Sequence, residues 1–488
     1  MFQLFHLSPD KPTSLQQQLR EQIAAGILNG NIPVDTPLPS SRKLAKLLNI
    51  ARNTVVLAYE HLLDDGYLIA RERSGYYVNP DILSGKVKVR EMPDEAMEGT
   101  PPDWQKLLKK HPAEQQNIGK PRDWQKYPYP FIYGQFDPSL FPTNNWRECC
   151  RDAVTVPAIR DWASDHFDDD DPVLVEQIRT RLLPRRGVWA AADEILVTVG
   201  AQQALDILAR LLLDKDSTLG IEDPGYVDIR NIAALNPSGL KPLPVDQDGL
   251  IVDEGLNDCD CLYTTPSHQC PTTATMPIER RYELLRRANE QDFVIIEDDY
   301  ESETNFKSNP IPALKSLDKS GRVIYIGSLS KTLAPGLRLG YLVGDAAFIR
   351  EARALRRLMV RHPPANNQRS VALFLERGYH DALIMNIMRV YQERWQEMGA
   401  ALAEYLPDSS RKPSFGGSCY WVEGPAGLDA RLLRKEAADR GILIEPGDIH
   451  FFGDNPPLNF FRLGYSSIAT ERIRPGIKAL AELIADMT

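Results

Sequence analysis

The chain has 488 residues, of which 43% are hydrophobic and 25% are charged, and its formal net charge at pH 7 is -10. These fractions are typical of globular proteins, and the length corresponds to roughly three domain-sized units, so wholesale disorder and a single small domain are excluded. The apolar runs are far shorter than the roughly 18 residues that a membrane span needs.

The N-terminus and the cysteines predict a cytoplasmic protein. Residues 1–12 contain no basic segment before an apolar run and no small-residue cleavage pattern, so we expect no secretory signal. The six cysteines are sparse and form no C-x-x-C pair of the metal or redox kind. We therefore expect reduced thiols, no metal site and a cytoplasmic location.

The negative charge is unevenly distributed along the chain. Residues 1–80 carry 8 Lys and Arg against 7 Asp and Glu, which gives a net charge of +1. Since the whole chain has a net charge of -10, residues 81–488 carry -11. Four basic residues and no acidic one fall within residues 38–56, namely Arg42, Lys43, Lys46 and Arg52. A local positive stripe favours contact with a phosphate backbone, although four charges alone are also typical of a solvated helix face.

The first 80 residues have the pattern of three short helices. Apolar residues recur four apart in residues 14–29, which predicts an amphipathic helix. Residues 40–48 predict a second helix capped by Ser40, and a third helix begins at Arg52. Only Asn49-Ile50-Ala51 separates the second helix from the third. Two helices joined by so short a turn predict a helix-turn-helix, whose second helix lies in the major groove of DNA.

The first side chains of the third helix are suited to DNA contacts. Arg and Asn make bidentate contacts with guanine and adenine edges, and Thr can bond a phosphate or touch a thymine methyl. Two alternating runs, residues 67–71 and 76–78, then predict a β-hairpin or wing. A three-helix bundle used only for protein contacts is the alternative. The expected DNA-binding residues are Ser41, Arg42, Arg52, Asn53, Thr54 and Gly75.

The string PLPSSRKLAKLLNIARNTVVLAYEHLLDDGYLIARERSGYYV resembles the winged-helix DNA-binding domain of the GntR regulators over essentially its whole length. Residues 1–80 are therefore expected to form a winged helix-turn-helix domain. Residues 81–126 are polar, charged and rich in proline, with little periodicity beyond a short helix near Trp104, and predict a linker. Fully extended at about 3.3 Å per residue, such a linker spans well over ~100 Å.

Residues 127–488 predict an α/β domain with a mostly parallel sheet. From residue 193 onward, short β-like runs alternate with helical segments. Ligands of such sheets bind at the carboxyl ends of the strands. The G-x-x-x-x-G-K-[ST], G-x-G-x-x-G and H-E-x-x-H motifs are all missing, which argues against nucleotide and zinc chemistry. The predicted strands include residues 195–199, 217–221, 261–264, 293–296 and 323–326.

The segment VIYIGSLSKTLAPGLRLGY carries side chains suited to binding pyridoxal 5'-phosphate. A lysine forms a Schiff base with the cofactor aldehyde through its neutral amine, and Lys331 follows a predicted strand. Nearby hydroxyl and guanidinium groups, and free backbone N–H groups where a helix follows the first strand, can bind the cofactor phosphate. The expected phosphate donors are Ser328, Ser330, Arg338, Gly200, Ala201 and Gln202.

The end of the strand FVIIEDDY supplies a carboxylate for the cofactor ring. The ring nitrogen must stay protonated for the ring to withdraw electrons, and a carboxylate beside it keeps it so. We predict that Asp298 is this carboxylate, with Asp299 as the alternative. Tyr300 is placed to bond the ring hydroxyl. An acidic cluster at a strand end is more often a solvated loop, but its coexistence with the lysine segment favours a cofactor site.

Five segments of the large domain resemble the fold-type I aminotransferases over residues 127–488. They are EDPGY (222–226), TPSHQCPT (265–272), IIEDDYESE (295–303), SLSKTLAPGLRLGY (328–341) and FRLGYSS (461–467). Joined to a GntR-like head, they resemble the MocR subfamily of regulators, whose aminotransferase-like domain is dimeric and binds pyridoxal phosphate. This resemblance implies an aldimine at Lys331, Asp298 at the pyridine nitrogen, Tyr300 at the phenolic oxygen, Tyr226 stacked on the ring, and Arg462 at the carboxylate of an amino-acid effector.

Two positions depart from the family pattern. Aminotransferases usually have an asparagine before the P-T-G turn, whereas this chain has SHQCPTT, so His268 or Gln269 is expected to substitute in the ring-oxygen contact. Two residues after Tyr226, where members answering to γ-aminobutyrate carry arginine, this chain has Asp228. That difference argues against γ-aminobutyrate as the effector.

The preferred hypothesis is a homodimeric transcriptional regulator that binds repeated DNA half-sites and senses an amino acid, an amine or the cofactor itself through an aldimine at Lys331. An active aminotransferase that carries a DNA-binding head is the alternative. A binding module with an empty pocket is a third hypothesis. Turnover that survives deletion of residues 1–80 would favour the enzyme, whereas a protein without the aldimine absorbance band would favour the empty pocket.

Overall fold

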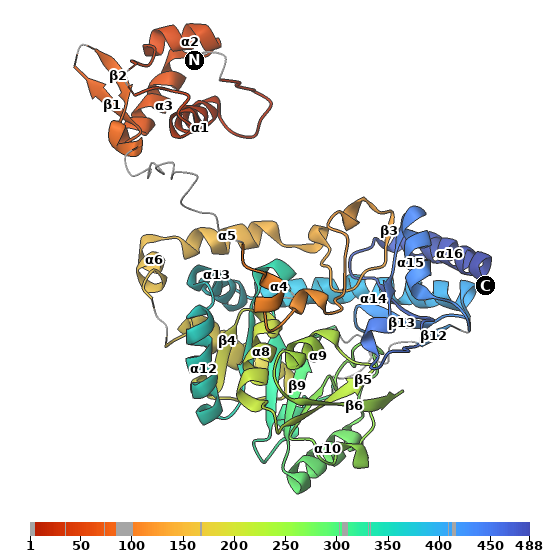
Figure 1. Cartoon of the computed structure of the whole chain (residues 1–488). Helices are drawn as coiled ribbons and strands as arrows, with labels where there is room; N and C mark the ends of the chain where they lie inside the picture. Colours follow the sequence, from red (N-terminus) through yellow and green to blue (C-terminus); the bar gives the residue numbers. More distant parts are fainter. Residues whose placement is uncertain are drawn as a thin grey trace. The chain divides into compact units, whose positions relative to one another are not determined.

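The protein is described by a computed structural model, and the described residues are 5–34, 36–72, 74–83, 101–165, 168–301, 303–304, 311–329, 331, 333–407, 409–411 and 416–488. The chain divides into two compact units, Met1–Leu107 and Leu108–Thr488, which we call the head and the large domain (Figure 1). In the part of the chain that the structure describes, no helix is long and apolar enough to cross a membrane.

The head contains the three helices and the hairpin that the sequence predicts. Their bounds are α1 (Leu15–Leu28), α2 (Ser41–Leu48), α3 (Arg52–Asp64), β1 (Leu68–Arg71) and β2 (Gly75–Val78). The Ser14 hydroxyl accepts a hydrogen bond from the Gln17 amide and the Ser40 hydroxyl accepts one from Lys43, so both serines cap the helices that follow them. Asn49, in the left-handed conformation with φ 52°, ends α2 and leaves a short turn before α3.

The apolar stripes of these helices meet in a core of their own. Leu19, Ile23 and Ile27 of α1 are fully buried together with Val55 and Leu62 of α3. Strands β1 and β2 pair antiparallel, as a wing requires. The predicted winged helix-turn-helix is therefore confirmed, and its core draws on residues of the head alone.

The large domain is built on an eight-stranded sheet in the order β4-β11-β10-β9-β8-β5-β6-β7. The strands β10, β9, β8, β5 and β6 are parallel to one another, while β4, β11 and β7 make antiparallel pairs, so the predicted mostly parallel sheet is confirmed. The strand bounds are β4 (Ile195–Thr198), β5 (Thr218–Asp223), β6 (Gly239–Asp246), β7 (Gly249–Leu250), β8 (Cys261–Thr264), β9 (Val294–Asp299), β10 (Val323–Ser328) and β11 (Gly340–Val343).

Helices cover this sheet and bury it on both faces. Two separate clusters of buried side chains use alternate residues of the same strands, for example Tyr325 in one and Ile324 and Ile326 in the other. The helices that follow the strands are α8 (Gly200–Leu212), α9 (Val227–Ala234), α10 (Ile278–Gln291), α11 (Leu314–Leu317) and α12 (Ala346–Val360). The remaining helices of this part are α5 (Thr143–Ala153), α6 (Val156–Trp162), α7 (Pro172–Gln177), α13 (Ala365–Glu376) and α14 (Tyr379–Tyr405).

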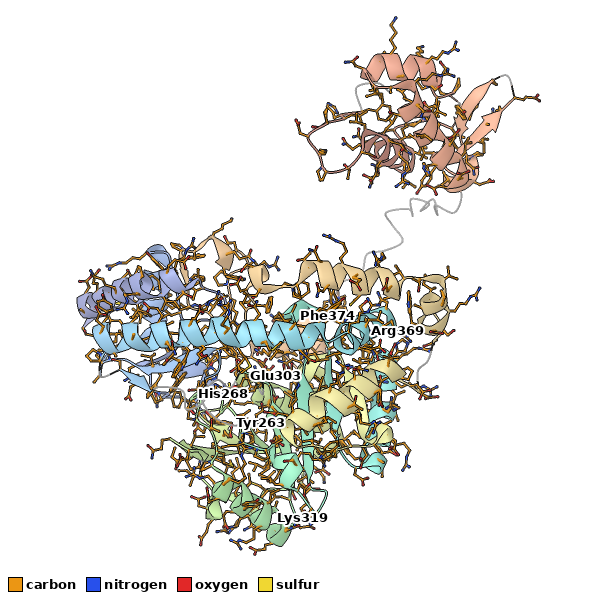
Figure 2. All side chains as sticks on the ribbon, turned by 180° about the vertical axis from the view of Figure 1, so that it is seen from behind. Tyr263, His268, Glu303, Lys319, Arg369 and Phe374 are labelled. Carbon is orange, nitrogen blue, oxygen red and sulfur yellow. The ribbon has the colours of Figure 1, made fainter. Side chains whose placement is uncertain are left out.

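A smaller C-terminal sheet, in the order β12-β13-β16-β15, packs with the long helix α14 and with α16 (Figure 1). Its bounds are β12 (Ser410–Arg411), β13 (Cys419–Glu423), β15 (Glu445–Pro446) and β16 (Phe460–Gly464), with α15 (Ala430–Asp439) and α16 (Thr470–Met487) beside it. A separate parallel pair joins β3 (Tyr129–Pro130) to β14 (Ile442–Leu443). Figure 2 shows the packed interior, where Phe374, Tyr263 and His268 lie, and Lys319 at an outer edge.

The acidic run Asp168 to Asp171 has a structural role. Asp170 is buried and accepts hydrogen bonds from Arg353 and Arg356. Asp171 caps α7 through the amides of Val173 and Leu174 and pairs with Arg369 at 2.7 Å. These carboxylates therefore fix α7 against α12 and α13.

The second half of the predicted linker differs from the expectation. Residues 108–126 belong to the large domain and are attached to it by hydrogen bonds. The Gln115 side chain donates to the Asn231 carbonyl at 2.9 Å, and Arg434 donates to the Gly119 carbonyl at 3.0 Å. We call residues 108–126 the strap. The strap is attached by polar side chains and backbone carbonyls rather than by an apolar stripe. Its sequence therefore has the polar composition of a linker, although it packs on the large domain.

Candidate functional site

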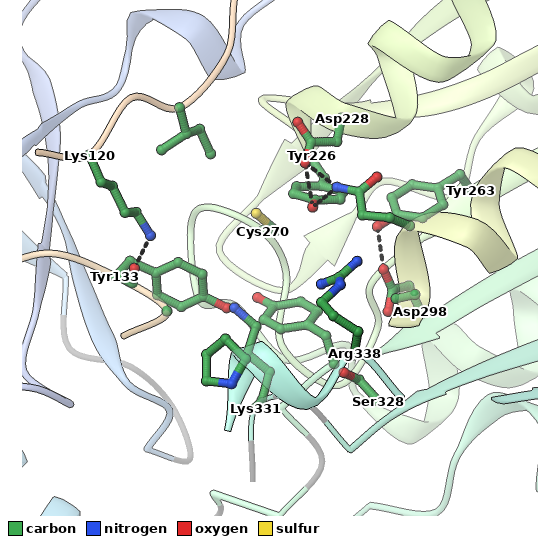
Figure 3. A pocket seen from close by; sticks show the side chains of 16 residues that line it. Lys120, Tyr133, Tyr226, Asp228, Tyr263, Cys270, Asp298, Ser328, Lys331 and Arg338 are labelled. Atoms are coloured by element: carbon green, nitrogen blue, oxygen red, sulfur yellow. Dashed lines mark hydrogen bonds between the residues drawn. The ribbon is translucent and has the colours of Figure 1, made fainter. Parts of the chain in front are cut away.

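A cavity of about 310 Å³ lies beside the carboxyl ends of β8, β9 and β10 (Figure 3). Side chains from the strands, from the loops after them and from the strap point into it. The lining residues are Ile118, Lys120, Tyr133, Gly134, Ala201, Gln202, Tyr226, Asp228, Tyr263, Cys270, Asp298, Tyr300, Ser328, Lys331, Pro335 and Arg338. The cavity has the size and the mixed apolar and polar lining of a small-molecule site.

Lys331 reaches this cavity from the loop that follows β10. Its Nζ atom lies 4.2 Å from the ring centroid of Tyr133 and would stand 2.8 Å from a Cβ atom at Gly134. Gly134 has φ +69°, so glycine suits both the backbone angle and this close approach. The pKa of Lys331 is lowered to about 8, chiefly by burial; Glu301 opposes this shift, and the positive charges of Lys120 and Arg462 contribute to it. About one tenth of this amine is therefore neutral at pH 7, far more than of an ordinary lysine.

Asp298 points into the cavity from the end of β9. Its Oδ2 atom accepts a hydrogen bond from the Tyr263 hydroxyl at 2.9 Å, while its buried Oδ1 atom has no hydrogen-bond partner. Burial raises the pKa of this carboxyl to about 7, and the bond from Tyr263 lowers it. A buried acceptor without a partner costs free energy, which a ligand N–H at Oδ1 would recover.

Asp299, the reserve candidate, faces away from the cavity because neighbouring residues of a strand point to opposite faces of the sheet. Its Oδ2 atom accepts hydrogen bonds from Arg186 Nε at 2.7 Å and from the Tyr325 hydroxyl at 2.8 Å. Asp299 is therefore a buried ion-pair residue of the core. The strand alternation leaves Asp298 as the carboxylate of the cavity.

Groups that can bind an anion converge at the start of α8. Gly200, the first residue of this helix, has φ +71°, and a Cβ atom there would stand 3.0 Å from Arg338 Nη2. A side chain at this position would therefore press on the guanidinium. The free N–H groups at the helix start favour an anion, and Arg338 adds a planar fork. Ser328, at the end of β10, lines the same cavity, whereas Ser330 lies outside the described residues.

Tyr226 belongs to a polar group on one wall of the cavity. Its hydroxyl donates to Asp228 Oδ2 at 2.8 Å and accepts from Gln202 Nε2 at 3.0 Å. Gln202 also donates to Asp228. Asp228 thus has two donors and gives this wall a negative charge where an arginine would give a positive one.

The structure corrects the expectation for the missing asparagine. Gln269 is saturated by structural bonds, with its amide donating to Pro224 O at 2.8 Å, and it does not line the cavity. His268 is buried beside Glu301, with Nε2 3.5 Å from Oε2, and does not line it either. Cys270 lines the cavity instead, directly before Pro271. Burial raises the pKa of its thiol to about 12, so it is a neutral, weak donor.

Arg462 lies beyond the cavity wall. Its Cζ atom is 4.0 Å from the ring centroid of Tyr133, which also makes an edge contact with Tyr300 at 6.5 Å. Arg462 is 2% exposed and donates from Nε to Glu445 Oε2 at 3.0 Å. Tyr133 and Tyr300 line the cavity, but Arg462 does not. The carboxylate that pairs with Arg462 in the structure is that of Glu445.

Sequence reasoning missed several lining residues. Cys270 could be found from its place directly before proline, where the family asparagine stands. Tyr263 and Tyr133 come from short buried strands or loops that carry no sequence signal of a site. Lys120 and Ile118 fall in the segment that the sequence assigns to the linker.

The predicted DNA-binding residues lie in the first turns of α2 and α3, except Gly75, which lies in the wing. Arg52 and Asn53 are exposed at the start of α3, and Thr54 is half-buried beside them. Arg52 Nε donates to the Ser41 hydroxyl at 3.4 Å, which joins the first turns of α2 and α3. Arg42 is exposed on α2, and Gly75 is exposed in the wing with φ +105°. These residues present a basic, hydrogen-bonding surface without acidic side chains in the first turns of either helix.

Comparison with protein families matches both units of the chain. Residues 15–78 match the bacterial regulatory proteins of the gntR family, and residues 172–480 match the aminotransferases of class I and II. The chain is similar to the HTH-type transcriptional regulator TauR of Rhodobacter capsulatus, with 42% identity over 484 residues that cover 98% of each chain. It is 31% identical to the probable rhizopine catabolism regulatory protein MocR of Rhizobium meliloti, over 97% of this chain and 94% of the relative.

Solved structures show the same aminotransferase fold. LysN, the α-aminoadipate aminotransferase of Thermus thermophilus, is 27% identical with a TM-score of 0.70, and the match covers 79% of this chain and 98% of LysN. That protein was crystallised in complex with N-(5'-phosphopyridoxyl)-L-leucine. The aminotransferase class and its solved members imply a pyridoxal phosphate cofactor.

Proposed function

Because this chain belongs to the MocR subfamily of GntR-type transcriptional regulators, we propose that its cavity binds pyridoxal 5'-phosphate and that an amine effector acts through this cavity on DNA binding by the head. The family membership rests on two regulators that match this chain over nearly its whole length and theirs, and on the two family models that match its two units. The full-length relatives are named as regulators, which disfavours an enzyme as the main function.

One observation carries the cofactor proposal. A lysine with a pKa of about 8 and a buried carboxylate oxygen without a partner face the same cavity. Pyridoxal phosphate, when bound, supplies an aldehyde that reacts with amines and a ring nitrogen that carries a proton. Lys331 provides the neutral amine for the aldehyde, and Asp298 Oδ1 accepts the ring N–H. The residues therefore fit the group.

Other side chains would hold the cofactor in place. The backbone N–H groups of Gly200, Ala201 and Gln202 and the side chains of Ser328 and Arg338 bind the phosphate. We assign Ser330 to the same phosphate set from the sequence alone. Tyr226 would stack on the ring, Tyr300 would donate to the ring oxygen, and the thiol of Cys270 stands where a family asparagine would donate.

We propose that the effector is an amine or amino acid whose amino group takes the place of Lys331 at the aldehyde. Arg462 then supplies a permanent positive charge to the side of the cavity that receives an acidic group. A ligand shifts a conformational equilibrium only by its differential affinity for the two states, so effector binding must favour one arrangement of the heads. We propose a cytoplasmic homodimer, because paired heads match repeated half-sites.

A spectrum combined with footprinting tests this function. The purified protein is expected to absorb in the visible range when supplied with pyridoxal phosphate, to change its spectrum with some amino acids or amines, and to protect DNA upstream of its own gene. Steady transamination with many turnovers, unaffected by deletion of residues 1–80, would establish the enzyme instead. A preparation that stays colourless with the cofactor would refute cofactor binding.

The pKa of Lys331 predicts how cofactor attachment depends on pH. At pH 7.5 an amine with a pKa of about 8 is about one quarter neutral, whereas an ordinary lysine is about one part in a thousand neutral. The rate of attachment to the apo protein should rise with pH and level off above about 8, measured as growth of the visible band between pH 6 and 10. Nα-acetyl-lysine is the matched control amine, and its rate should continue to rise up to pH 10. A protein rate that follows the control would contradict the assignment.

Replacement of Asp298 by asparagine should weaken cofactor binding by roughly tenfold, since a charged hydrogen-bond partner contributes about 1.5 kcal/mol or more. Titration of the apo protein with pyridoxal phosphate measures this loss. The apo protein should remain folded, because burial already raises the pKa of this carboxyl to about 7.

The raised pKa of Asp298 also predicts the direction in which the stability of the apo protein changes with pH. A carboxyl whose pKa is higher in the folded than in the unfolded state stabilises the fold fully below about pH 4, and this contribution is lost as the pH rises through about 7. Melting temperatures of the apo wild type should therefore fall more steeply over that range than those of Asp298→Asn. Equal slopes would mean that Asp298 ionises normally.

A further inference from the structure

The strap carries a basic side chain into the cofactor cavity. Ile118 and Lys120 both line the cavity, although they precede the region that matches the aminotransferases by more than 50 residues. Figure 3 shows Lys120 extending from the strap toward Tyr133. The strap is held on this side by the bond from Arg434 to the Gly119 carbonyl at 3.0 Å. Lys120 therefore belongs to the cavity, although its segment has the composition of a linker.

Lys120 belongs to a cluster of three charged side chains with Glu445 and Arg462, which we call the acid-binding cluster. Glu445 Oε2 is 2.8 Å from Arg462 Nη2, and Glu445 Oε1 is 3.3 Å from Lys120 Nζ. Glu445 is 5% exposed and Arg462 is 2% exposed. Two cations share one carboxylate, so the cluster has a net charge of +1. The Lys120 side chain is 22% exposed and also donates to the Tyr133 carbonyl, and the excess positive charge of the cluster favours an anionic ligand.

The position of each member decides where that anion can bind. Arg462 lies behind Tyr133 and Glu445 does not line the cavity, so Lys120 alone of the three is exposed to it. A Cβ atom at Gly134 would stand 2.8 Å from Lys331 Nζ and 3.5 Å from Lys120 Nζ, so the two amines converge on one point. A ligand whose amino group approaches the Lys331 position therefore has Lys120 within reach of its acidic group.

The other cations of the cavity have different tasks. Arg338 lies against Gly200 at the start of α8, on the phosphate side. Lys331 is the amine for the aldehyde. Among the described lining residues, Lys120 is the remaining basic side chain. Asp228, which accepts hydrogen bonds from Tyr226 and Gln202, would repel an acid placed on its own wall.

We propose that Lys120 binds the acidic group of the effector and so makes the regulator selective for amines that carry an acid. This proposal rests on the proposed function, in which an effector amine enters the cofactor cavity. Glu445 and Arg462 position the lysine, because Glu445 holds its ammonium group while Arg462 offsets the charge of Glu445. The rival interpretation is that Lys120 is an anchor that merely fixes the strap.

Matched ligand pairs test this proposal on the full-length, cofactor-loaded protein. Glycine is compared with ethylamine and 3-aminopropanoate with propylamine, so that a methyl group replaces the carboxylate in each pair, and the apparent affinity of each ligand is taken from the change in the visible spectrum. The wild type should prefer at least one acid over its matched amine by tenfold or more. Lys120→Met should reduce that preference about tenfold by weakening the acid alone, and Lys120→Arg should retain most of it because the charge is kept.

Lys126→Met is the control for the strap, since Lys126 is exposed on the same segment and pairs only with Asp123 at 3.5 Å. It should leave the preference unchanged. If Lys120→Met weakens acids and amines equally, Lys120 is an anchor and the proposal is wrong. If the wild type shows no preference for either acid, or neither acid changes its spectrum, the proposal is also overturned. A protein that does not take up the cofactor fails earlier, at the visible band, which identifies a failure of the proposed function instead.

Discussion

Lys331→Ala is expected to abolish covalent attachment of the cofactor completely. After borohydride reduction of the wild type, mass spectrometry should find the phosphopyridoxyl adduct on the peptide that contains residue 331, and the variant should show none. The reason is positional as well as chemical. Burial lowers the pKa of this amine to about 8, and its Nζ atom lies against Tyr133 and Gly134 inside the cavity.

The variant should retain part of its cofactor affinity. The phosphate groups around Gly200 and the carboxylate of Asp298 are untouched, so pyridoxal phosphate should still bind, more weakly and reversibly. Lys319→Ala removes a lysine from the exposed outer edge of the same domain and is the matched control (Figure 2). An adduct that persists in Lys331→Ala, or that disappears in Lys319→Ala, would show that another lysine reacts.

Arg52→Ala should weaken specific DNA binding by about 10- to 100-fold, equivalent to about 1–3 kcal/mol for one bidentate base contact. Arg52 is exposed at the start of α3 and is oriented by the Ser41 hydroxyl at 3.4 Å. Titration of the protein on a footprinted operator and on scrambled DNA at one salt concentration measures the effect. The loss should be larger on the operator, because a phosphate contact would weaken both sequences alike.

The spectrum of Arg52→Ala provides the internal control. The head and the large domain have separate hydrophobic cores, so the visible band and its response to amines should be those of the wild type. Lys319→Ala removes one positive charge from the large domain and should leave operator binding unchanged. Normal operator binding by Arg52→Ala would mean that α3 does not place this residue at a base edge.

The head and the main sheet could be predicted because their signals are local. Apolar residues four apart, a capping serine and a three-residue turn specify α1, α2 and α3 almost alone. The antiparallel strand β11 could not be predicted in the same way. Its four residues, Gly340–Val343, lie at the end of the segment that carries Lys331 and Arg338. Their position between β4 and β10 depends on pairing with strands that are distant in the sequence.

The site residues that directly follow a strand could be predicted from the sequence. The residues whose role depends on a contact with a distant segment could not. Strand alternation separates Asp298 from Asp299 once β9 is placed. The carboxylate partner of Arg462 is different, because Glu445 comes opposite it only through the antiparallel pairing of β15 with β16. The contribution of Lys120 depends on contacts of a polar segment that no periodicity marks.

The position of the strap has a consequence for dissecting this regulator into parts. A recombinant fragment that begins at Tyr127 would contain the sheet and Lys331, yet one wall of the cavity would be open to water where Ile118 and Lys120 had been. Such a fragment would mislead a ligand screen, since it would lose a charge and an apolar contact that the intact chain supplies. Cutting before Leu108 keeps both, and the same boundary suits a chimaera in which this sensor is fused to a foreign DNA reader.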